Sequence, residues 1–481
     1  MKRIICFIIC LSLIPLLSGC KRQGERELSS YDIKVTLFED MTLSGSLEYG
    51  FTCFEDGLES FCFNLYPNAF RKDAEVSPIF ESDYLLVYEN GFSSGSIDIL
   101  SVKAQGEKVD FSVGETNLQI LEIYFNEPLK KGEKCSVYIE FKVVLPNAIH
   151  RFGYGENTIN LTGFYPIACF FKDGEFVKNF YYPAGDPFFS ECANYNVSLT
   201  VPSTFTVASS LKAVGTVWSG GTTEYLYERK SVRDIAFILS EDFNVARKDA
   251  NGVAVSYYYY LDDNPEKTLQ TAVESLNYFS EKFYRYPYGE YVVCEGDFIY
   301  GGMEYPCLSL IADTVGEHRD YTVAHETAHQ WFYGIVGVNQ SEEGYLDEGL
   351  TELATVLFMD GKSGKSYDDY IAQAKNSYRA LDSALKVSGN LNPPVMNRNL
   401  KDFSSEGEYV MIAYKRSLIA IDALKDYVGD KKFKKALNKF VSENAFSNAT
   451  TDDFISVFDK KKRGAGKFFK DFVQGKAEVI Y

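Results

Sequence analysis

The chain has 481 residues, enough for two to four domains at about 100–200 residues each. Hydrophobic residues make up 46% and charged residues 24%, as in folded globular proteins, which excludes a mainly disordered, collagen-like or coiled-coil chain. There are 49 lysine and arginine residues against 67 aspartate and glutamate residues, a formal net charge of -18. This balance argues against a nucleic-acid partner, because binding a polyanion requires a basic surface.

The first twenty residues have the pattern of a secretory signal. A basic start at residues 2–3 precedes an apolar run over residues 4–17, and Ser-Gly-Cys20 follows. The run is shorter than the ~20 apolar residues that a membrane-spanning helix needs. Its Leu-Ser-Gly-Cys ending resembles the lipobox of bacterial lipoproteins, in which the cysteine is lipidated and becomes the mature N-terminus. We expect a signal peptide over 1–19, a membrane-binding lipidated Cys20, a polar tether over 20–31, and a location in the bacterial cell envelope outside the cytoplasm.

Residues 32–250 have the pattern of an antiparallel β domain. Short alternating runs are separated by Gly, Pro, Asn and Asp, as at Gln119–Phe125, Cys135–Val144 and Tyr195–Val201. From about residue 251 the apolar period becomes that of helices. Strands are predicted at Tyr291–Val293 and Cys307–Ile311, and helices at Pro265–Tyr284, 320–335, 345–359, 366–385, 409–428 and 431–445. Thr450 and Asp453 predict a capping box that opens a last helix. The fold class is therefore α+β, with a β domain followed by a mainly helical domain over 251–481.

Cysteine usage leaves the redox state open. Seven of the ten cysteines follow Cys20, so they cannot all pair with one another. Cys294 and Cys307 flank a predicted turn at residues 301–302 and could face each other on adjacent strands. We favour free thiols there, although an oxidising compartment would favour a disulfide.

The central stretch contains a candidate metal site. His325 and His329 are four residues apart, so on a helix both imidazoles lie on one face. Glu326 lies about 100° further round that helix, close enough to reach a water at the metal without binding the metal itself. A catalytic zinc site takes three protein ligands and keeps one position open. Glu348, near the start of the next predicted helix, is the candidate third ligand, and two imidazoles with one carboxylate suit Zn²⁺. The alternative is a pair of histidines with structural roles only.

These motifs resemble those of the aminopeptidase N and leukotriene hydrolase family of gluzincin metallopeptidases. The matching stretches are His-Glu-x-x-His-Gln-Trp-Phe from His325 and Leu-Asp-Glu-Gly-Leu from Leu346. Residues 301–306, Gly-Gly-Met-Glu-Tyr-Pro, resemble the family's Gly-x-Met-Glu-Asn exopeptidase motif, and Tyr414 precedes Lys415 where the family has a catalytic tyrosine. Asp186-Pro187 is a weaker match. The resemblance covers most of residues 32–475 and implies a thermolysin-like catalytic domain with one zinc ion per chain.

The resemblance also implies roles for individual residues. His325, His329 and Glu348 would bind the zinc ion, and Glu326 would act as general base and then as general acid. Tyr414 would donate a hydrogen bond to the oxyanion. The motif residues Gly302, Met303 and Glu304 would bind substrate, with Glu304 holding the free α-amine. Tyr414 could instead be a core residue. Glu352, one turn beyond Glu348, could orient an imidazole or could be a solvated surface residue.

Three departures from the family pattern leave the activity open. Tyr305 replaces the Asn of the exopeptidase motif, and residues 160–166 contain no Gln or acid to serve as a second amine-binding group. The sequence ends at residue 481 without the helical roof domain of long family members, so we expect an open cleft. The first hypothesis is a zinc aminopeptidase that trims peptides outside the cell. The alternatives are a zinc endopeptidase and a surface lipoprotein that binds a partner without turnover.

Overall fold

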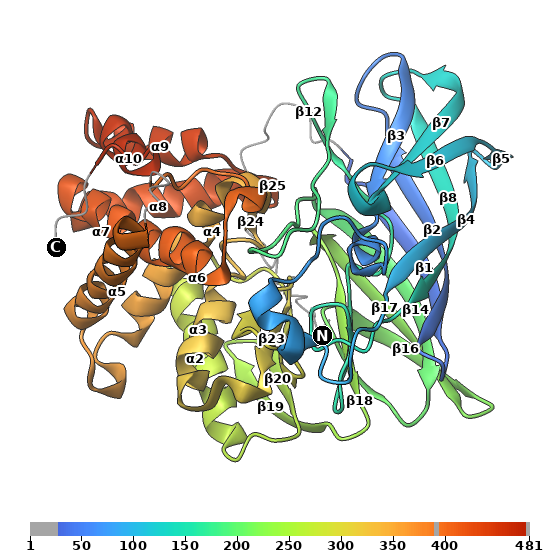
Figure 1. Cartoon of the computed structure of the whole chain (residues 1–481), viewed down its shortest axis with the longest axis horizontal. Helices are drawn as coiled ribbons and strands as arrows, with labels where there is room; N and C mark the ends of the chain where they lie inside the picture. The colour runs from blue at the N-terminus through green and yellow to red at the C-terminus, as the bar shows by residue number, and fades with distance from the viewer. Residues whose placement is uncertain (1–26, 389–393, 478–481) are drawn as a thin grey trace, which may run out of the picture.

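The computed structural model describes residues 27–388 and 394–477. The predicted signal, Cys20 and most of the tether lie outside the described residues. Figure 1 shows a β-rich N-terminal part beside a helical C-terminal part, which is the expected α+β arrangement. Within the described ranges, no helix combines the length and the apolar character needed to cross a bilayer.

An eight-stranded sheet forms the outer wall of the N-terminal part (Figure 1). All its neighbours are antiparallel except β1 and β14, which run parallel. In order, the strands are β16 (Lys212–Ser219), β17 (Thr222–Val232), β14 (Ala193–Pro202), β1 (Ser30–Leu37), β2 (Thr42–Thr52), β8 (Lys134–Val144), β4 (Ser96–Ala104) and β5 (Glu107–Lys108). Along β8 every second side chain from Cys135 to Val143 is buried, which is the alternation expected of a strand with one face on a core.

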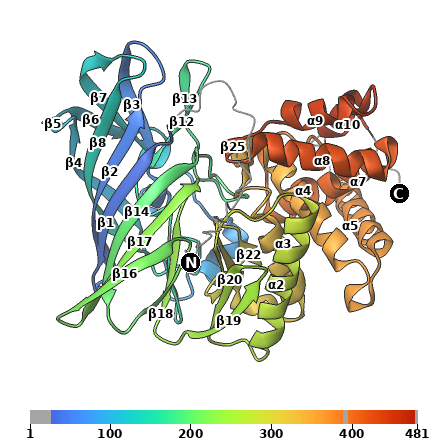
Figure 2. The same cartoon turned by 180° about the vertical axis from the view of Figure 1, so that it is seen from behind.

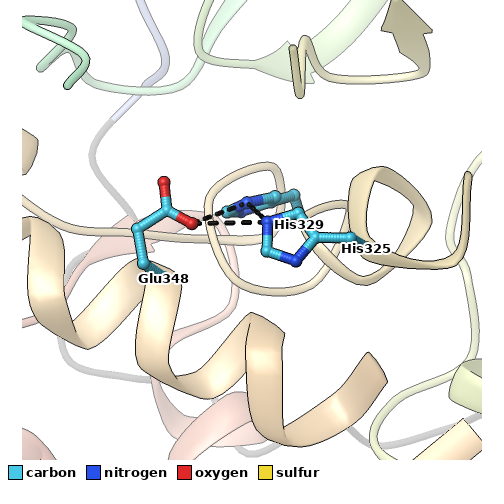
Figure 3. A group of neighbouring side chains, drawn as sticks. All are labelled: His325, His329 and Glu348. Carbon is cyan, nitrogen blue, oxygen red and sulfur yellow. Dashed lines mark hydrogen bonds and ion pairs between the residues drawn. The ribbon is translucent and has the colours of Figure 1, made fainter. Parts of the chain in front are cut away.

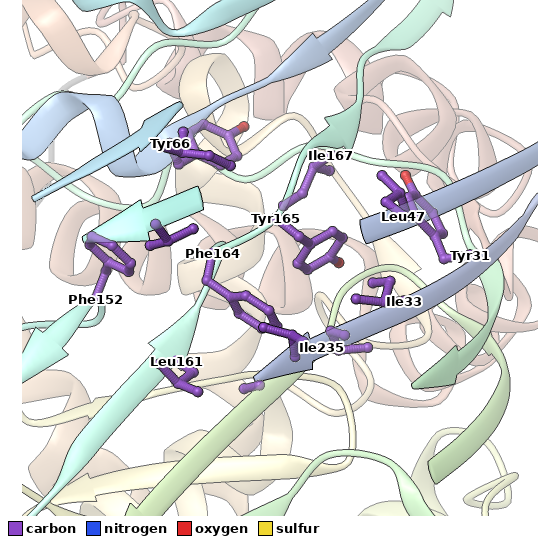
Figure 4. Close-up of a cluster of buried hydrophobic side chains, with 14 of the residues drawn as sticks. Tyr31, Ile33, Leu47, Tyr66, Phe152, Leu161, Phe164, Tyr165, Ile167 and Ile235 are labelled. Carbon is purple, nitrogen blue, oxygen red and sulfur yellow. The ribbon is translucent and has the colours of Figure 1, made fainter. Parts of the chain in front are cut away.

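Smaller sheets pack on the inner face of this wall. One has the order β15 (Thr206–Ser209), β18 (Ala236–Ser240), β10 (Ile159–Thr162), β9 (Gly153–Tyr154). Another has the order β11 (Ile167–Ala168), β3 (Leu58–Asn64), β7 (Ile120–Leu129), β6 (Asp110–Gly114), and β12 (Phe170–Lys172) pairs with β13 (Glu175–Val177). Short helical segments connect them: α1 (Tyr84–Val87) and 3₁₀ turns at Tyr66–Phe70, Glu81–Asp83 and Thr116–Leu118. Figure 4 shows the aromatic and aliphatic core between the layers, including Tyr31, Leu47, Phe164 and Tyr165.

The second part begins with a five-stranded sheet. Its order is β19 (Asn244–Ala250), β20 (Val253–Tyr259), β21 (Glu290–Gly296), β23 (Leu308–Ala312) and β22 (Gly302–Met303). β20, β21 and β23 are parallel, whereas the short edge strand β22 runs antiparallel to β23. Helices α2 (Pro265–Lys282) and α3 (Arg319–Ala328) pack on this sheet, and a 3₁₀ segment at Asp313–His318 leads into α3. The chain therefore places the edge strand β22 next to α3.

Helices make up the rest of the chain. They are α4 (Gln340–Met359), α5 (Tyr367–Ser388), α6 (Glu406–Tyr409), a π-helical segment (Val410–Arg416), α7 (Ser417–Val428), α8 (Asp430–Asn444), α9 (Thr451–Asp459) and α10 (Ala465–Val473), with 3₁₀ turns at Lys362–Gly364 and Leu400–Asp402. The pair β24 (Val336–Gly337) and β25 (Ser447–Asn448) ties the start of this region to its end. In Figure 2, seen from behind, α9 and α10 lie away from the eight-stranded sheet. The capping box of Thr450 and Asp453 is confirmed.

Two predicted helices differ from the structure. The helix predicted over 320–335 ends at Ala328. Beyond it the chain turns, and its backbone hydrogen bonds join residues five positions apart: Gly334 N donates to His329 O, and Val336 N donates to Trp331 O. This turn buries the apolar side chains that extended the helical pattern. The helix predicted over 409–428 contains the π-helical segment. The apolar period of 3.6 residues does not distinguish a single π-helical turn from a turn of α-helix.

The predicted relation between Cys294 and Cys307 is wrong. β21 and β23 are parallel, and the register partner of Cys294 is Leu310, so the two thiols do not face each other across a hairpin. All seven cysteines in the described part of the chain are free and buried.

Candidate metal centre and substrate cavity

A cavity of about 330 Å³ lies where the two parts of the molecule meet. The β-rich part contributes Arg151 and Asp186 to its lining. The edge strand β22 and the residue after it contribute Gly302 and Glu304, and the helical part contributes His325, Glu326, His329, Glu406 and Tyr414. Catalytic candidates from regions far apart in the sequence thus share one concave site.

The three predicted ligands meet at one wall of this cavity. His325 Nε2 and His329 Nε2 are 3.1 Å apart, and Glu348 Oε2 lies 3.4 Å and 3.3 Å from them. Figure 3 shows the two imidazoles and the carboxylate pointing toward one another, from α3, the residue after it, and α4. Tetrahedral zinc with bonds of ~2.0–2.1 Å places its ligand atoms ~3.3–3.4 Å apart. Glu348 Oε2 is also buried with no hydrogen-bond partner among the described residues. The donor set and its spacing therefore fit a zinc ion.

Both imidazoles are held from their outer side. His329 Nδ1 lies 2.9 Å from the carbonyl oxygen of Phe332 and 3.1 Å from Asp347 Oδ1, which leaves Nε2 free to face the metal position. His325 Nδ1 lies 3.3 Å from Glu352 Oε1. Glu352 is buried and accepts hydrogen bonds from Lys415 and Tyr321 at 2.9 Å and 3.1 Å. Glu352 therefore lies beside His325 Nδ1, as an orienting role would require, and the alternative of a solvated surface residue is wrong.

The electrostatics of the ligand group follow from its burial. Burial alone would raise the pKa of Glu348, but the neighbouring imidazoles of His329 and His325 lower it to about 2. Burial would lower the pKa of His325, whereas the carboxylates of Glu348 and Glu352 raise it, to about 9. The buried carboxylates and imidazoles therefore stabilise one another's charged forms.

Glu326 lies against the backbone of the edge strand. A Cβ placed on Gly302 would be 2.5 Å from Glu326 Oε1 and 2.6 Å from its Cγ, so only glycine allows this approach. Burial raises the pKa of Glu326 to about 7, against the opposing effect of the two imidazoles. Its Oε2 is buried and has no hydrogen-bond partner within the described ranges. Glu326 is thus positioned as a proton acceptor facing the cavity rather than as a structural carboxylate.

The exopeptidase-like motif places one carboxylate in the cavity. Glu304 is 3% exposed, and its Oε1 accepts a hydrogen bond of 2.9 Å from Gln340 Nε2. Burial, and next the charge of Asp186, raise the pKa of Glu304. Met303 is different: its side chain is buried in the core of the β-rich part, with Sδ 3.0 Å from Arg151 Nε, so any contact of Met303 with a ligand would involve its backbone.

Tyr414 comes from the π-helical segment. Its ring stacks on that of His325, with centroids 5.7 Å apart and an interplanar angle of 10°, and it lines the cavity. π-helical turns inside α-helices occur frequently at functional sites. Tyr414 therefore lies beside the ligand group, and it is also partly buried against the core of the helical part.

Several residues in or next to the cavity were not predicted as site residues from the sequence. Arg151 Nη2 and Asp186 Oδ1 form a buried ion pair of 2.7 Å. Asp186-Pro187 gave a weak motif signal, whereas nothing near Arg151 in the sequence indicated a site. Gln340 and Asp347 were likewise not assigned roles, although Asp347 belongs to the Leu-Asp-Glu-Gly-Leu stretch.

Two known aminopeptidases are similar in sequence to part of this chain. Aminopeptidase M1-C of Oryza sativa subsp. japonica is 26% identical over 291 residues, 56% of this chain and 32% of the rice protein. Endoplasmic reticulum aminopeptidase 2 of Bos taurus is 23% identical over 398 residues, 75% of this chain and 40% of that protein. The chain thus spans about a third to two fifths of the length of these relatives.

A solved structure matches nearly the whole chain. The M1 zinc metallopeptidase of Deinococcus radiodurans is 18% identical with a TM-score of 0.68, over 94% of this chain and 95% of its own, which shows the same fold. A variant of that protein was solved bound to a Tyr-Ser-Ala substrate. Residues 267–474 of the present chain match the model described as the peptidase family M1 domain. The similarity to the peptidase family M1 domain thus covers most of the helical part of this chain, including His325, His329 and Glu348.

Proposed function

We propose that this chain is a zinc-dependent aminopeptidase that removes N-terminal residues from peptides. The observation that carries the proposal is that His325, His329, Glu326 and Glu304 line one cavity, with the third ligand Glu348 directly beside the two imidazoles. The aminopeptidases among its relatives support the same reading.

The chain's own residues fill the chemical roles of peptide hydrolysis. A zinc ion held by His325, His329 and Glu348 would polarise the scissile carbonyl and make water more acidic. The Glu326 carboxylate takes the proton from the attacking water and delivers it to the leaving amine. The Tyr414 hydroxyl donates a hydrogen bond to the oxyanion that develops from the carbonyl oxygen.

Glu304 supports action at the N-terminus of the substrate. It follows the edge strand β22 and is buried close to Asp186, which makes this end of the cavity acidic. A buried carboxylate attracts an ammonium group more strongly than a solvated one does, and so it fixes the register of the peptide. The charge of Asp186 is already balanced by Arg151, so Glu304 is the better partner for a substrate α-amine.

The test compares one unstructured peptide in two forms, free and N-acetylated, incubated with the zinc-loaded protein and followed by mass spectrometry. We expect stepwise loss of residues from the free form only. Glu326→Gln should abolish turnover of the free form, and Glu304→Gln should raise KM for the free form. Internal cleavage of both forms would instead assign a zinc endopeptidase, and an absence of turnover with zinc bound would favour a binding protein.

The N-terminal sequence supports a proposed location. A signal over residues 1–19 and lipidation of Cys20 would attach the enzyme to the outer face of a bacterial membrane and present it to peptides outside the cytoplasm. In a bacterial host, the full chain should fractionate with membranes and gain the mass of acyl chains, whereas Cys20→Ser should do neither. Recovery of the unmodified wild-type chain in the cytosol would contradict this part of the proposal.

A further inference from the structure

Gln340, the first residue of α4, makes an unusual pair of contacts beside the metal centre. It is 2% exposed, and its Nε2 donates to Glu304 Oε1 at 2.9 Å and to Asp347 Oδ2 at 2.7 Å. Both partners are carboxylate oxygens, which accept hydrogen bonds when ionised, and the NH₂ of the amide is the group that faces them. Both of its hydrogens are used, while the amide oxygen is buried with no hydrogen-bond partner within the described ranges.

The two carboxylates belong to different functions of the site. Glu304 is the proposed partner of the substrate α-amine. Asp347 lies 3.1 Å from His329 Nδ1 through its other oxygen, and His329 Nε2 belongs to the ligand group. A single side-chain amide therefore lies between the substrate side and the metal side of the cavity.

The two hydrogen bonds from Gln340 stabilise a pair of buried carboxylates. Glu304 and Asp347 are both buried, 3% and 2% exposed, and both carboxylates contact the same amide. Two buried carboxylates without donors would lose solvation, repel each other and rotate apart. The forked donation from Gln340 satisfies one oxygen of each, and charge-assisted hydrogen bonds of this kind are stronger than neutral ones.

We propose that Gln340 is a positioning residue that fixes Glu304 and Asp347 relative to each other, and thereby couples the α-amine position to the orientation of the zinc ligand His329. The Glu304 side of this inference rests on the proposed aminopeptidase function, whereas the His329 side does not. Gln340 touches neither the reacting atoms nor the metal position itself; it acts through the two carboxylates.

The test uses Gln340→Met, which keeps the length of the side chain without a donor, and Gln340→Glu, which keeps its shape but replaces the NH₂ with an oxygen. Zinc affinity is measured by chelator competition without substrate, and kcat and KM are measured separately at saturating zinc with a free-amine peptide. We expect zinc binding to weaken about 10–100-fold, as for other residues that orient metal ligands. KM should rise about tenfold, the effect of one lost hydrogen bond to a charged group, with a smaller change in kcat.

Gln119→Met is the matched control, because Gln119 is a fully buried glutamine of the β-rich part whose Oε1 accepts from the backbone of Tyr181. It should lower thermal stability without changing zinc affinity or KM. Wild-type zinc affinity and KM in both folded Gln340 variants would overturn the proposal. If the wild-type enzyme cleaves free and acetylated peptides alike, the aminopeptidase function fails, but the zinc measurement still decides whether Gln340 acts on His329.

Discussion

The contact between Gly302 and Glu326 gives a sharp test of the site geometry. In Gly302→Ala the new Cβ would lie 2.5 Å from Glu326 Oε1, whereas ordinary contacts of this kind lie at about 3.5 Å. The carboxylate must therefore move by about 1 Å, and a displacement of that size costs about a hundredfold in rate, or ~2.7 kcal/mol in the barrier. The zinc ligands are not touched, so zinc content should remain at one ion per chain.

The neighbouring glycine supplies the control. A Cβ on Gly301 would meet nothing closer than Thr322 at 3.8 Å, so Gly301→Ala should keep nearly wild-type activity. The assay is kcat/KM for a free-amine peptide, together with metal analysis and a melting curve for each variant. Equal activities of the two alanine variants, both fully zinc-loaded and folded, would refute the inferred position of Glu326 against the edge strand.

Three further predictions concern other parts of the structure. Asp347→Asn should weaken zinc binding about 10–100-fold in chelator competition, because it removes the carboxylate beside His329 Nδ1. Tyr414→Phe should lower kcat about 10²–10³-fold with little change in KM, because the hydroxyl is needed only when negative charge develops on the carbonyl oxygen. An unchanged kcat would show that Tyr414 only packs against its neighbours. Burial raises the pKa of Asp234 to about 6, although the hydrogen bond from Tyr333 opposes this shift. The folded protein therefore holds this proton more tightly than the unfolded chain does. The resulting stabilisation is complete below pH 4 and is lost as the pH rises through 6. The unfolding free energy of wild type minus that of Asp234→Asn should fall by about 2 kcal/mol from pH 4 to pH 7 in urea titrations; a constant difference would contradict the shift.

How far the sequence reveals this site depends on how local each contact is. His325 and His329 were predictable because a single helical turn brings them together, whatever the rest of the chain does. Arg151 was not, because its contact with Met303 spans 152 residues and exists only once the two parts have packed. Likewise, the turn that ends α3 early and the π-helical turn at Tyr414 serve tertiary packing, which apolar periodicity does not encode.

Gly349, which follows Glu348 in the Leu-Asp-Glu-Gly-Leu stretch, allows a close contact between two helices. A Cβ on Gly349 would lie 2.5 Å from Ser417 Cβ and 3.0 Å from Ile421, so glycine lets α4 approach α7 closely. The π-helical segment directly precedes α7, so the same approach places the Tyr414 ring on that of His325. The close packing of α4 against α7 thus contributes to the position of the proposed oxyanion donor relative to the metal ligands. That packing gives the Asp-Glu-Gly-Leu stretch a second physical role besides supplying the third ligand.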